Sequence, residues 1–367
     1  MEEKKILFIT TTFIFKKELE GIKNKLIAQK QAMENLGLKV DFVSVDEPYK
    51  VFLNGLQILD FKNHFLFSLS FFIGLLRKLR LEHYQYVYIR NPLVFDQYGF
   101  IKFLKRNSSS YILLEFPTYP FKKERISIYQ MATYYSMYFM RKLYKNYINV
   151  ILYSGNKVDN IYGIRAIQIK HSANLKKYQI SDSHFDIEKV NFILVASFAK
   201  WHGIERLLEG LKRYITHEMK NGPKVHLFLI GYNEPLFAKF KSFVIKNSLE
   251  KYITMPGALQ GKELDSYFDR ANIGIGSLGM HRIGLFEGSP LKTAEYAARG
   301  VPFVVGYKDS NFYDKKYCFQ IPADESPVDI VRILNWYSKL SIDKEAMRKF
   351  AVSNFSWEVQ FKSLFNL

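Results

Sequence analysis

The sequence predicts an α/β protein of two doubly wound domains, each built on a parallel sheet. Short apolar runs alternate with longer helical patterns along the chain, and a second series of the same kind begins near residue 189. The 367 residues suffice for two domains that each bury a core. Apolar residues make up 48% of the chain and charged residues 24%, which excludes collagen-like, coiled-coil and low-complexity chains.

The periodicity places the elements of both domains. In the first half we expect strands at 5–10, 39–44, 85–90, 111–115 and 149–154, and helices at 20–36, 64–80 and 123–145. In the second half we expect strands at 190–197, 225–231, 253–256, 273–277 and 302–306, and helices at 203–217, 234–247, 261–270 and 289–299.

These elements define the predicted domains. The first covers residues 1–173, a polar linker covers 174–188, and the second domain covers 189–355. The closing helix, 356–367, is expected to return to the first domain. Ligands of open parallel sheets bind beyond the carboxyl ends of the strands, so we expect the active site between two domains that face each other.

The charge of the chain predicts an anionic partner. Lysine and arginine outnumber aspartate and glutamate by 53 to 35, and residues 1–170 hold 26 of these cations against 14 acids. Nucleic acid, a membrane face and a phosphorylated ligand all fit this excess. A single cysteine, Cys318, excludes an intramolecular disulfide and favours the cytoplasm.

One segment predicts contact with a membrane. Tyrosines and phenylalanines alternate with lysines and arginines over residues 129–147, as in helices that lie on anionic interfaces. The alternative is a core helix with a basic edge. The most apolar stretch, residues 64–76, is too short to span a bilayer. We expect a cytoplasmic protein that is peripheral on the inner face of the cell membrane.

The most informative motif lies at residues 273–304. A predicted strand ends in a loop rich in glycine and serine, Glu287 precedes a helix that starts near Ser289, and Glu295 lies two turns into that helix. Amides at a helix start bind diphosphates, and carboxylates accept hydrogen bonds from sugar hydroxyls. The alternative is an acid favoured by the helix dipole together with a solvated helix residue.

This stretch resembles the Glu-x7-Glu signature of retaining family-4 glycosyltransferases with the GT-B fold, of the type that builds bacterial capsules and exopolysaccharides. Other blocks resemble the same family in the same order, over nearly the whole chain. They are Gly21–Gln29, Tyr88–Arg90, Glu115–Pro120, Trp201–Arg206, Leu229–Gly231 and Phe355–Trp357.

The resemblance implies a role for each matching donor-side residue. Glu295 would bind the donor ribose, and Glu287 would be the catalytic carboxylate at the transferred sugar. The backbone amides expected at the sugar and phosphates belong to Gly288, Ser289 and Leu291, and Gly231 would lie near the base. Pro290 replaces the usual glycine and lacks an N–H.

The leaving diphosphate needs positive charge, because this family works without a metal. His202, which stands where the family has a lysine, is a candidate donor-binding residue, and a structural stacking on Trp201 is its alternative. Lys292 is our first candidate for the missing cation and Lys200 the second. Arg206 and Arg282 are further candidates for donor contacts, and an ordinary surface cation is the alternative for each.

On the acceptor side, residues 116–117 stand where many family members have a histidine. Gly21, Glu115, Thr118 and Tyr119 are the candidates for this side, with a buried, hydrogen-bonded Glu115 as the alternative. A separate base is not required, because the leaving phosphate can accept the proton of the acceptor hydroxyl.

The resemblance therefore implies a metal-independent, retaining hexosyltransferase without a cofactor. It would use a nucleotide-diphosphate sugar, with UDP as the expected nucleotide, and a lipid-linked or polysaccharide acceptor. Two alternatives stay open: a GT-B nucleotide-sugar epimerase or hydrolase, and a non-enzymatic basic protein that binds nucleic acid. The latter is disfavoured, because the chain has no nucleic-acid recognition motif.

Overall fold

The computed structural model describes residues 4–14, 20–79, 84–90, 92, 94–119, 128–169 and 175–365. Its contacts divide the chain into two compact units. Unit 1 comprises Met1–Ile169 and Trp357–Leu367, and unit 2 comprises Lys170–Ser356. The predicted domain boundary at residue 173 and the start of the predicted linker lie outside the described residues.

Unit 1 contains one mostly parallel sheet, in which nine strands are described, in the order β4-β3-β2-β1-β5-β6-β7-β9-β8. The strands are β1 (Lys5–Phe13), β2 (Lys39–Glu47), β3 (Lys50–Leu53), β4 (Leu56–Asp60), β5 (Tyr86–Arg90), β6 (Tyr111–Tyr119), β7 (Val150–Gly155), β8 (Asn160–Ile161) and β9 (Ile164–Gln168). Strands β1, β5, β6 and β7 run in parallel, and β7 is buried along its whole length, as expected for a sheet covered on both faces.

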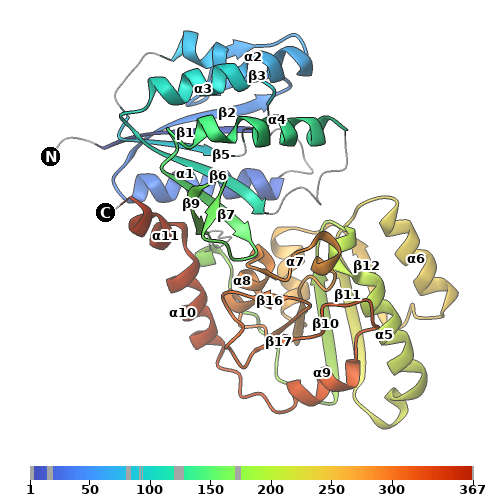
Figure 1. Ribbon diagram of the computed structural model, residues 1–367. Coiled ribbons are helices and arrows are strands. Elements are labelled where there is room, and N and C mark those ends of the chain that lie inside the picture. The colour runs from blue at the N-terminus through green and yellow to red at the C-terminus, as the bar shows by residue number, and fades with distance from the viewer. Residues whose placement is uncertain are drawn as a thin grey trace. The chain divides into compact units, whose positions relative to one another are not determined.

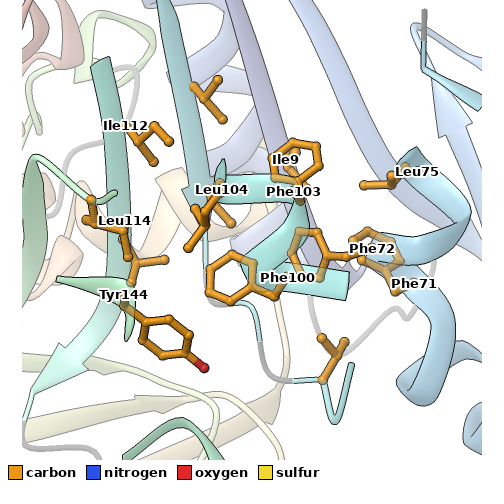
Figure 2. Close-up of a cluster of buried hydrophobic side chains, with 14 of the residues drawn as sticks. Ile9, Phe71, Phe72, Leu75, Phe100, Phe103, Leu104, Ile112, Leu114 and Tyr144 are labelled. Atoms are coloured by element: carbon orange, nitrogen blue, oxygen red, sulfur yellow. The ribbon is translucent and has the colours of Figure 1, made fainter. Parts of the chain in front are cut away.

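Helices cover both faces of this sheet (Figure 1). On one face lie α2 (His64–Lys78), α3 (Gln97–Arg106) and α4 (Ile128–Tyr144), and on the other lie α1 (Glu20–Asn35) and α11 (Trp357–Leu364). Figure 2 shows the core under the first group, where aromatic rings of α2 and α3 meet apolar residues of the strands. Phe72 of α2 contacts Phe100 of α3 at a ring distance of 4.7 Å.

The buried carboxylate of Asp96 joins α2 to α3. Its Oδ1 accepts a hydrogen bond from the amide of Gly99 and so caps α3, while its Oδ2 accepts from the amide of Ile73. Ile73 lies three residues beyond Ser70, whose backbone is not helical and kinks α2. One side chain thus satisfies amides at a helix start and at a kink, where backbone partners are missing.

Unit 2 contains a parallel sheet of six described strands in the order β12-β11-β10-β13-β15-β17. The strands are β10 (Lys189–Val195), β11 (Lys224–Ile230), β12 (Ile253–Gly257), β13 (Ile273–Ile275), β15 (Phe303–Val305) and β17 (Cys318–Gln320). Numbered along the chain, this is the 3-2-1-4-5-6 order of the dinucleotide-binding fold. The order reverses between β10 and β13, which defines the switch point of the sheet.

Helices also cover both faces of the sheet of unit 2. One face carries α5 (Ile204–His217), α6 (Leu236–Lys246) and α9 (Ile330–Tyr337). The other carries α7 (Gly261–Phe268), α8 (Leu291–Ala298) and α10 (Lys344–Phe355). Short 3-10 turns are η3 (Leu175–Lys177), η4 (Lys200–His202), η5 (Met219–Asn221) and η6 (Met280–Ile283), and a small ladder pairs β14 (Glu287–Gly288) with β16 (Lys308–Asp309).

The predicted fold class is confirmed, and the main differences lie in short elements. Sequence periodicity missed the β3–β4 hairpin, α3, β8, β9, β17, α9 and α10, of which α10 is the longest with 12 residues. The helix expected at 123–145 is described from Ile128 to Tyr144, and residues 123–127 lie outside the described residues. The closing helix α11 packs against α1 within unit 1, where Trp357 and Phe361 are buried. No described helix has both the length and the apolar composition needed to span a bilayer.

Gly231, directly after β11, permits a close backbone crossing. Its φ is 140°, and a Cβ there would lie 1.7 Å from the carbonyl oxygen of Ala196, which follows β10. Because the backbone fixes the position of a Cβ and the carbonyl oxygen of Ala196 is itself a backbone atom, the overlap can be relieved only by separating the ends of β10 and β11. Gly261 also has a positive φ, of 56°, but has no atom within 4 Å of such a Cβ.

We therefore expect Gly231→Ala to destabilise the protein by about 3 kcal/mol, as overpacking does. Gly261→Ala should lower the free energy of unfolding by about 1 kcal/mol, because it adds only the strain of a positive φ. Urea unfolding of both variants, followed by circular dichroism, measures the difference. Equal midpoints for the two variants would show that the crossing at Gly231 is not tight.

Candidate functional site

The loops that follow β10 and β13 meet at the switch point of unit 2. The amide of Leu278 donates to the carbonyl of His202 at 3.0 Å, and the amide of Gly279 donates to the carbonyl of Trp201 at 3.1 Å. Gly203, with a φ of 60°, makes this approach possible, since a Cβ there would lie 2.9 Å from the nitrogen of Gly279. The switch point is the usual ligand position in sheets of this order.

A third loop, after β15, joins the same contact. The amide of Gly306 donates to the carbonyl of Ser277 at 3.0 Å, and a Cβ on Gly306 would lie 2.7 Å from the carbonyl oxygen of Leu278. The carboxyl ends of three neighbouring strands are therefore held together by backbone contacts. The candidate donor site is built on this support.

The segment that carries Glu287 is held by the segment that follows β15. The amide of Lys308 donates to the carbonyl of Phe286 at 2.9 Å, and the amide of Ser310 donates to the carbonyl of Gly288 at 3.0 Å. The Glu287 carboxylate lies 3.8 Å from the ammonium of Lys308. Both side chains reach solvent, so water screens this ion pair and it stabilises the fold little.

A buried polar cluster fixes Ser289 and the start of α8. Asn311 donates from its side chain to the hydroxyl of Ser289. The carboxylate of Asp309 accepts from the hydroxyl of Thr293 at 2.8 Å and from the amide of Asn311 at 3.0 Å. Sequence analysis missed Thr293, Asp309 and Asn311. The polar triplet Asp309-Ser310-Asn311, which begins three residues after Gly306 at the end of a predicted strand, was the available signal.

Lys292 lies in the first turn of α8 with its ammonium nitrogen buried. Among the described residues this nitrogen has no hydrogen-bond partner. Burial lowers the pKa of Lys292 to about 7. Burial and the nearby Lys292 ammonium also hold the pKa of His202 well below its usual range, so His202 is neutral. An unpaired buried ammonium at the start of a helix is a position where an anion would be stabilised.

Glu295 follows Lys292 by one turn and has partners in unit 2. Its carboxylate accepts from Nε of Arg299 at 3.0 Å, and Arg299 also pairs with Asp265 at 2.8 Å. Burial raises the pKa of Glu295, and the guanidinium of Arg299 opposes this shift. Arg299 therefore orients the carboxylate, which also has a hydrogen bond with the side chain of Tyr178.

Two predicted donor-site arginines are engaged within unit 2. The guanidinium of Arg206 is buried and bonds to the carbonyls of Leu278, Pro322 and Ser326 and to Asp324. Arg282 bonds to Glu205 and Glu325 and to the carbonyl of Lys200. These hydrogen bonds fasten the switch-point loops to residues 322–326. A contact of either guanidinium, or of the Lys200 ammonium, with a ligand stays a prediction.

In unit 1, the acceptor candidate Glu115 is fully buried in an ionic cluster. Its carboxylate pairs with Lys25 at 3.1 Å and with Arg90 at 3.2 Å, and it accepts from Gln29 at 3.0 Å and from Tyr88 at 2.7 Å. Burial alone would raise the pKa of Glu115. The two cations and the two hydrogen bonds outweigh burial and hold the pKa well below its usual range.

This geometry agrees with the structural alternative for Glu115. Lys25 comes from α1 and also lies 5.3 Å above the ring of Trp357 in α11, while Arg90 and Glu115 are register partners on β5 and β6. The cluster thus joins two helices to the centre of the sheet. A catalytic role for Glu115 has no support from this arrangement, since both carboxylate oxygens are occupied.

The other acceptor candidates lie at element ends. Thr118 and Tyr119 are the half-buried last residues of β6, and the ring of Tyr119 meets the ring of Tyr153 edge-on at 6.0 Å. Gly21 is the second residue of α1. The acceptor role of Gly21, Thr118 and Tyr119 stays a prediction.

Comparisons with known proteins establish the fold. No family model matches the sequence, and no curated protein matches it. Sucrose-phosphate synthase from Thermosynechococcus elongatus has a similar structure, with a TM-score of 0.66, 13% identity and coverage of 99% of this chain and 98% of that one. HepE of Anabaena in complex with UDP has a TM-score of 0.63 and 13% identity, with 99% and 100% covered.

The lipopolysaccharide outer core galactosyltransferase WaaB is similar as well, with a TM-score of 0.62, 12% identity and 99% of both chains covered. These proteins have the GT-B fold. The present chain therefore has the GT-B fold over its whole length. At these low sequence identities, the similarity shows the fold alone.

The Glu115 cluster generates a prediction about stability. Glu115→Gln should destabilise the protein by about 3 to 5 kcal/mol at neutral pH, because Lys25 and Arg90 are left as unpaired buried cations. The pKa of Glu115 is depressed in the folded protein, so its contribution is present above the unfolded pKa and is lost as pH falls below it. The gap between wild type and variant should therefore shrink in acid.

Urea unfolding at neutral and acidic pH measures this gap. Glu34→Gln is the matched control, because Glu34 pairs with Lys30 on the same helix α1 at a partly exposed site. It should change stability by less than about 1 kcal/mol. Equal effects of the two substitutions would contradict the account of the buried cluster.

Proposed function

We propose that this protein is a retaining glycosyltransferase of the family-4 type. It would move a hexose from a nucleotide-diphosphate sugar, with UDP as the expected nucleotide, to a lipid-linked or polysaccharide acceptor in cell-surface polysaccharide synthesis. The observation that carries the proposal is the buried, unpaired ammonium of Lys292 at the start of α8, next to the switch-point loops. The GT-B fold and the Glu-x7-Glu pattern supply the context.

Lys292 supplies the charge that the leaving diphosphate requires. The family lysine is replaced by His202, which is neutral and cannot take that role. Lys292 approaches the same place from α8, as its electrostatic effect on His202 indicates. A diphosphate oxygen would give the ammonium its missing partner and would also benefit from the N-terminal dipole of α8.

Glu295 and Glu287 would contact two other parts of the donor, the ribose and the transferred sugar. Glu295, oriented by Arg299, would accept hydrogen bonds from the ribose hydroxyls. Glu287 has a weak, solvent-reaching pair with Lys308 and would accept from hydroxyls of the transferred sugar, where positive charge develops in the transition state. The departing phosphate would take the proton of the acceptor hydroxyl, so no separate base and no metal is assigned.

UDP fits as the first nucleotide to test, because the similar HepE structure contains UDP. The cationic excess of residues 1–170 fits an acceptor that carries phosphate, such as a polyprenyl-diphosphate-linked sugar. A nucleotide-sugar epimerase or hydrolase would need no such acceptor. A nucleic-acid-binding protein would need neither the buried lysine nor the glutamates.

Substitution of the glutamates should separate binding from turnover. Glu295→Ala should weaken UDP-glucose binding by about tenfold or more, as the loss of hydrogen bonds to a charged group does. Glu287→Ala should leave binding nearly unchanged and lower kcat by about 100-fold, because it acts on the transition state. Calorimetry and donor turnover measure the two effects.

Glu209→Ala is the control for these variants, since this carboxylate lies on α5 and pairs only weakly with Lys212 and Arg213. It should change neither quantity. Small and equal losses for Glu287→Ala and Glu295→Ala would remove both residues from the donor site.

Lys292 should make donor affinity depend on pH. Its pKa is about 7 in the free protein, and a bound diphosphate would raise it, so binding takes up a proton. The affinity for UDP-glucose should fall by up to about tenfold per pH unit above pH 7 and level off below it. UDP-glucose is the suitable probe, because its diphosphate does not titrate in this range.

Lys292→Arg should flatten this profile, because arginine stays charged throughout. Lys292→Ala should weaken UDP-glucose binding at pH 7 more than uridine binding. A steep profile that persists in Lys292→Arg would assign the titration to another group and would move the diphosphate site away from α8.

A further inference from the structure

The outer surface of one helix layer in unit 1 exposes an unusual number of large apolar side chains. The layer consists of α2, α3 and α4, which lie together on one face of the sheet (Figure 1). Ile128 is 87% exposed, Phe139 73% and Phe65 68%. The other exposed apolar residues of the layer are Leu66, Leu69, Tyr98, Met131, Tyr135, Tyr138 and Leu143. Exposed apolar surface of this extent marks an interaction site.

Helices α2 and α4 contact each other near their N-terminal ends. The hydroxyls of Ser68 and Tyr129 are 2.6 Å apart, and the rings of His64 and Tyr129 are 4.7 Å apart. His64 precedes Phe65, and Tyr129 follows Ile128, so the exposed Phe65 and Ile128 belong to helix ends that meet at this contact. We name the exposed face of α2, α3 and α4 the outer helix face.

The charges of this face have one sign. Over their full bounds α2, α3 and α4 contain no aspartate or glutamate. Their cations are Arg77, Lys78, Lys102, Lys105, Arg106, Arg141 and Lys142. The helix dipole favours cations in the last turn, but it also favours acids in the first turn, and none is there.

Two cations of the outer helix face lie directly above aromatic rings of the same helix. The ammonium of Lys102 lies 4.3 Å above the ring of Tyr98, and the guanidinium of Arg141 lies 3.7 Å above the ring of Tyr138. Long basic side chains that extend along apolar surface can place their charge at a headgroup while the rings enter the interface.

We propose that the outer helix face docks unit 1 onto an anionic phospholipid bilayer. The apolar side chains would enter the boundary between headgroups and acyl chains, and the cations would meet the lipid phosphates. A second copy of this chain is a poor occupant, because two faces with cations only repel each other. Nucleic acid would use the cations but would leave Phe65, Leu66 and Leu69 in water.

The burial pattern of α4 combines both interpretations of residues 129–147, a core helix and a helix that contacts a membrane. Met137 and Tyr144 are buried in the core of unit 1, while Tyr135, Tyr138 and Phe139 are exposed. Helix α4 therefore packs against the sheet with one side and offers the other to a partner. The apolar helix α2, which is too short to span a bilayer, contributes the remaining part of the outer helix face.

Vesicle sedimentation of the full-length protein tests the proposal. We expect binding to vesicles of phosphatidylcholine with phosphatidylglycerol, and little binding to phosphatidylcholine alone. The double variant Phe65→Ser with Phe139→Ser should reduce binding by about tenfold or more. Ile245→Ser with Val331→Ser is the matched control, because these residues are similarly exposed in unit 2, and its binding should equal that of the wild type.

A charge variant, Arg77→Gln with Lys78→Gln and Lys142→Gln, should also weaken binding and reduce its dependence on salt. Three outcomes would overturn the proposal: no binding of the wild type to anionic vesicles, binding that the control variant loses equally, and binding that neither test variant changes. Circular dichroism of each variant verifies folding.

The membrane test is independent of the proposed enzymatic function. The proposal concerns the outer helix face of unit 1 alone and does not require the donor site of unit 2. UDP-glucose binding is measured in parallel on the same samples. Lost vesicle binding with retained nucleotide binding, or the reverse, shows which of the two proposals fails.

Discussion

The candidate donor site depends on a backbone contact between the loops that follow β10 and β13. In that contact Leu278 donates to the carbonyl of His202, and Gly203 leaves room for the approach. The turn that carries Lys200 and His202 is thereby fixed against the turn that carries Arg282. The loop after β15 joins them through Gly306 and in turn holds the segment with Glu287. Any side chain larger than hydrogen at these two glycines would move the whole set.

Positive charge serves two different purposes in the two units. In unit 2 the buried ammonium of Lys292 has no hydrogen-bond partner among the described residues and has a lowered pKa, which suits one compact and highly charged ligand. In unit 1 the cations of α2, α3 and α4 are spread over an apolar face, which suits a diffuse anionic surface. The Glu115 cluster is a third case, where buried cations hold the sheet to α1 and α11. Net charge alone distinguishes none of these.

Patterns local in sequence predicted the fold class and most long elements, because buried parallel strands and amphipathic helices carry a strong periodic signal. The β3–β4 hairpin, α3, α9 and α10 were missed, since elements of 12 residues or fewer offer few repeats. The partners of Glu115 lie at Lys25 and Arg90, far away in the chain, so no local pattern shows that this carboxylate is occupied. Lys292 was predicted as the diphosphate cation from its place in the motif, whereas its burial and lack of a partner required the structure.

The most direct test of the donor site is a thermal-shift measurement of the purified protein with UDP, GDP and ADP. A ligand that binds only the folded protein raises its melting temperature by mass action. We expect a clear increase in melting temperature with one nucleoside diphosphate, with UDP as the expected one, and a smaller increase with the matching monophosphate. An unchanged melting temperature with all three diphosphates would contradict the assignment of a nucleotide-sugar site to α8 and the switch-point loops.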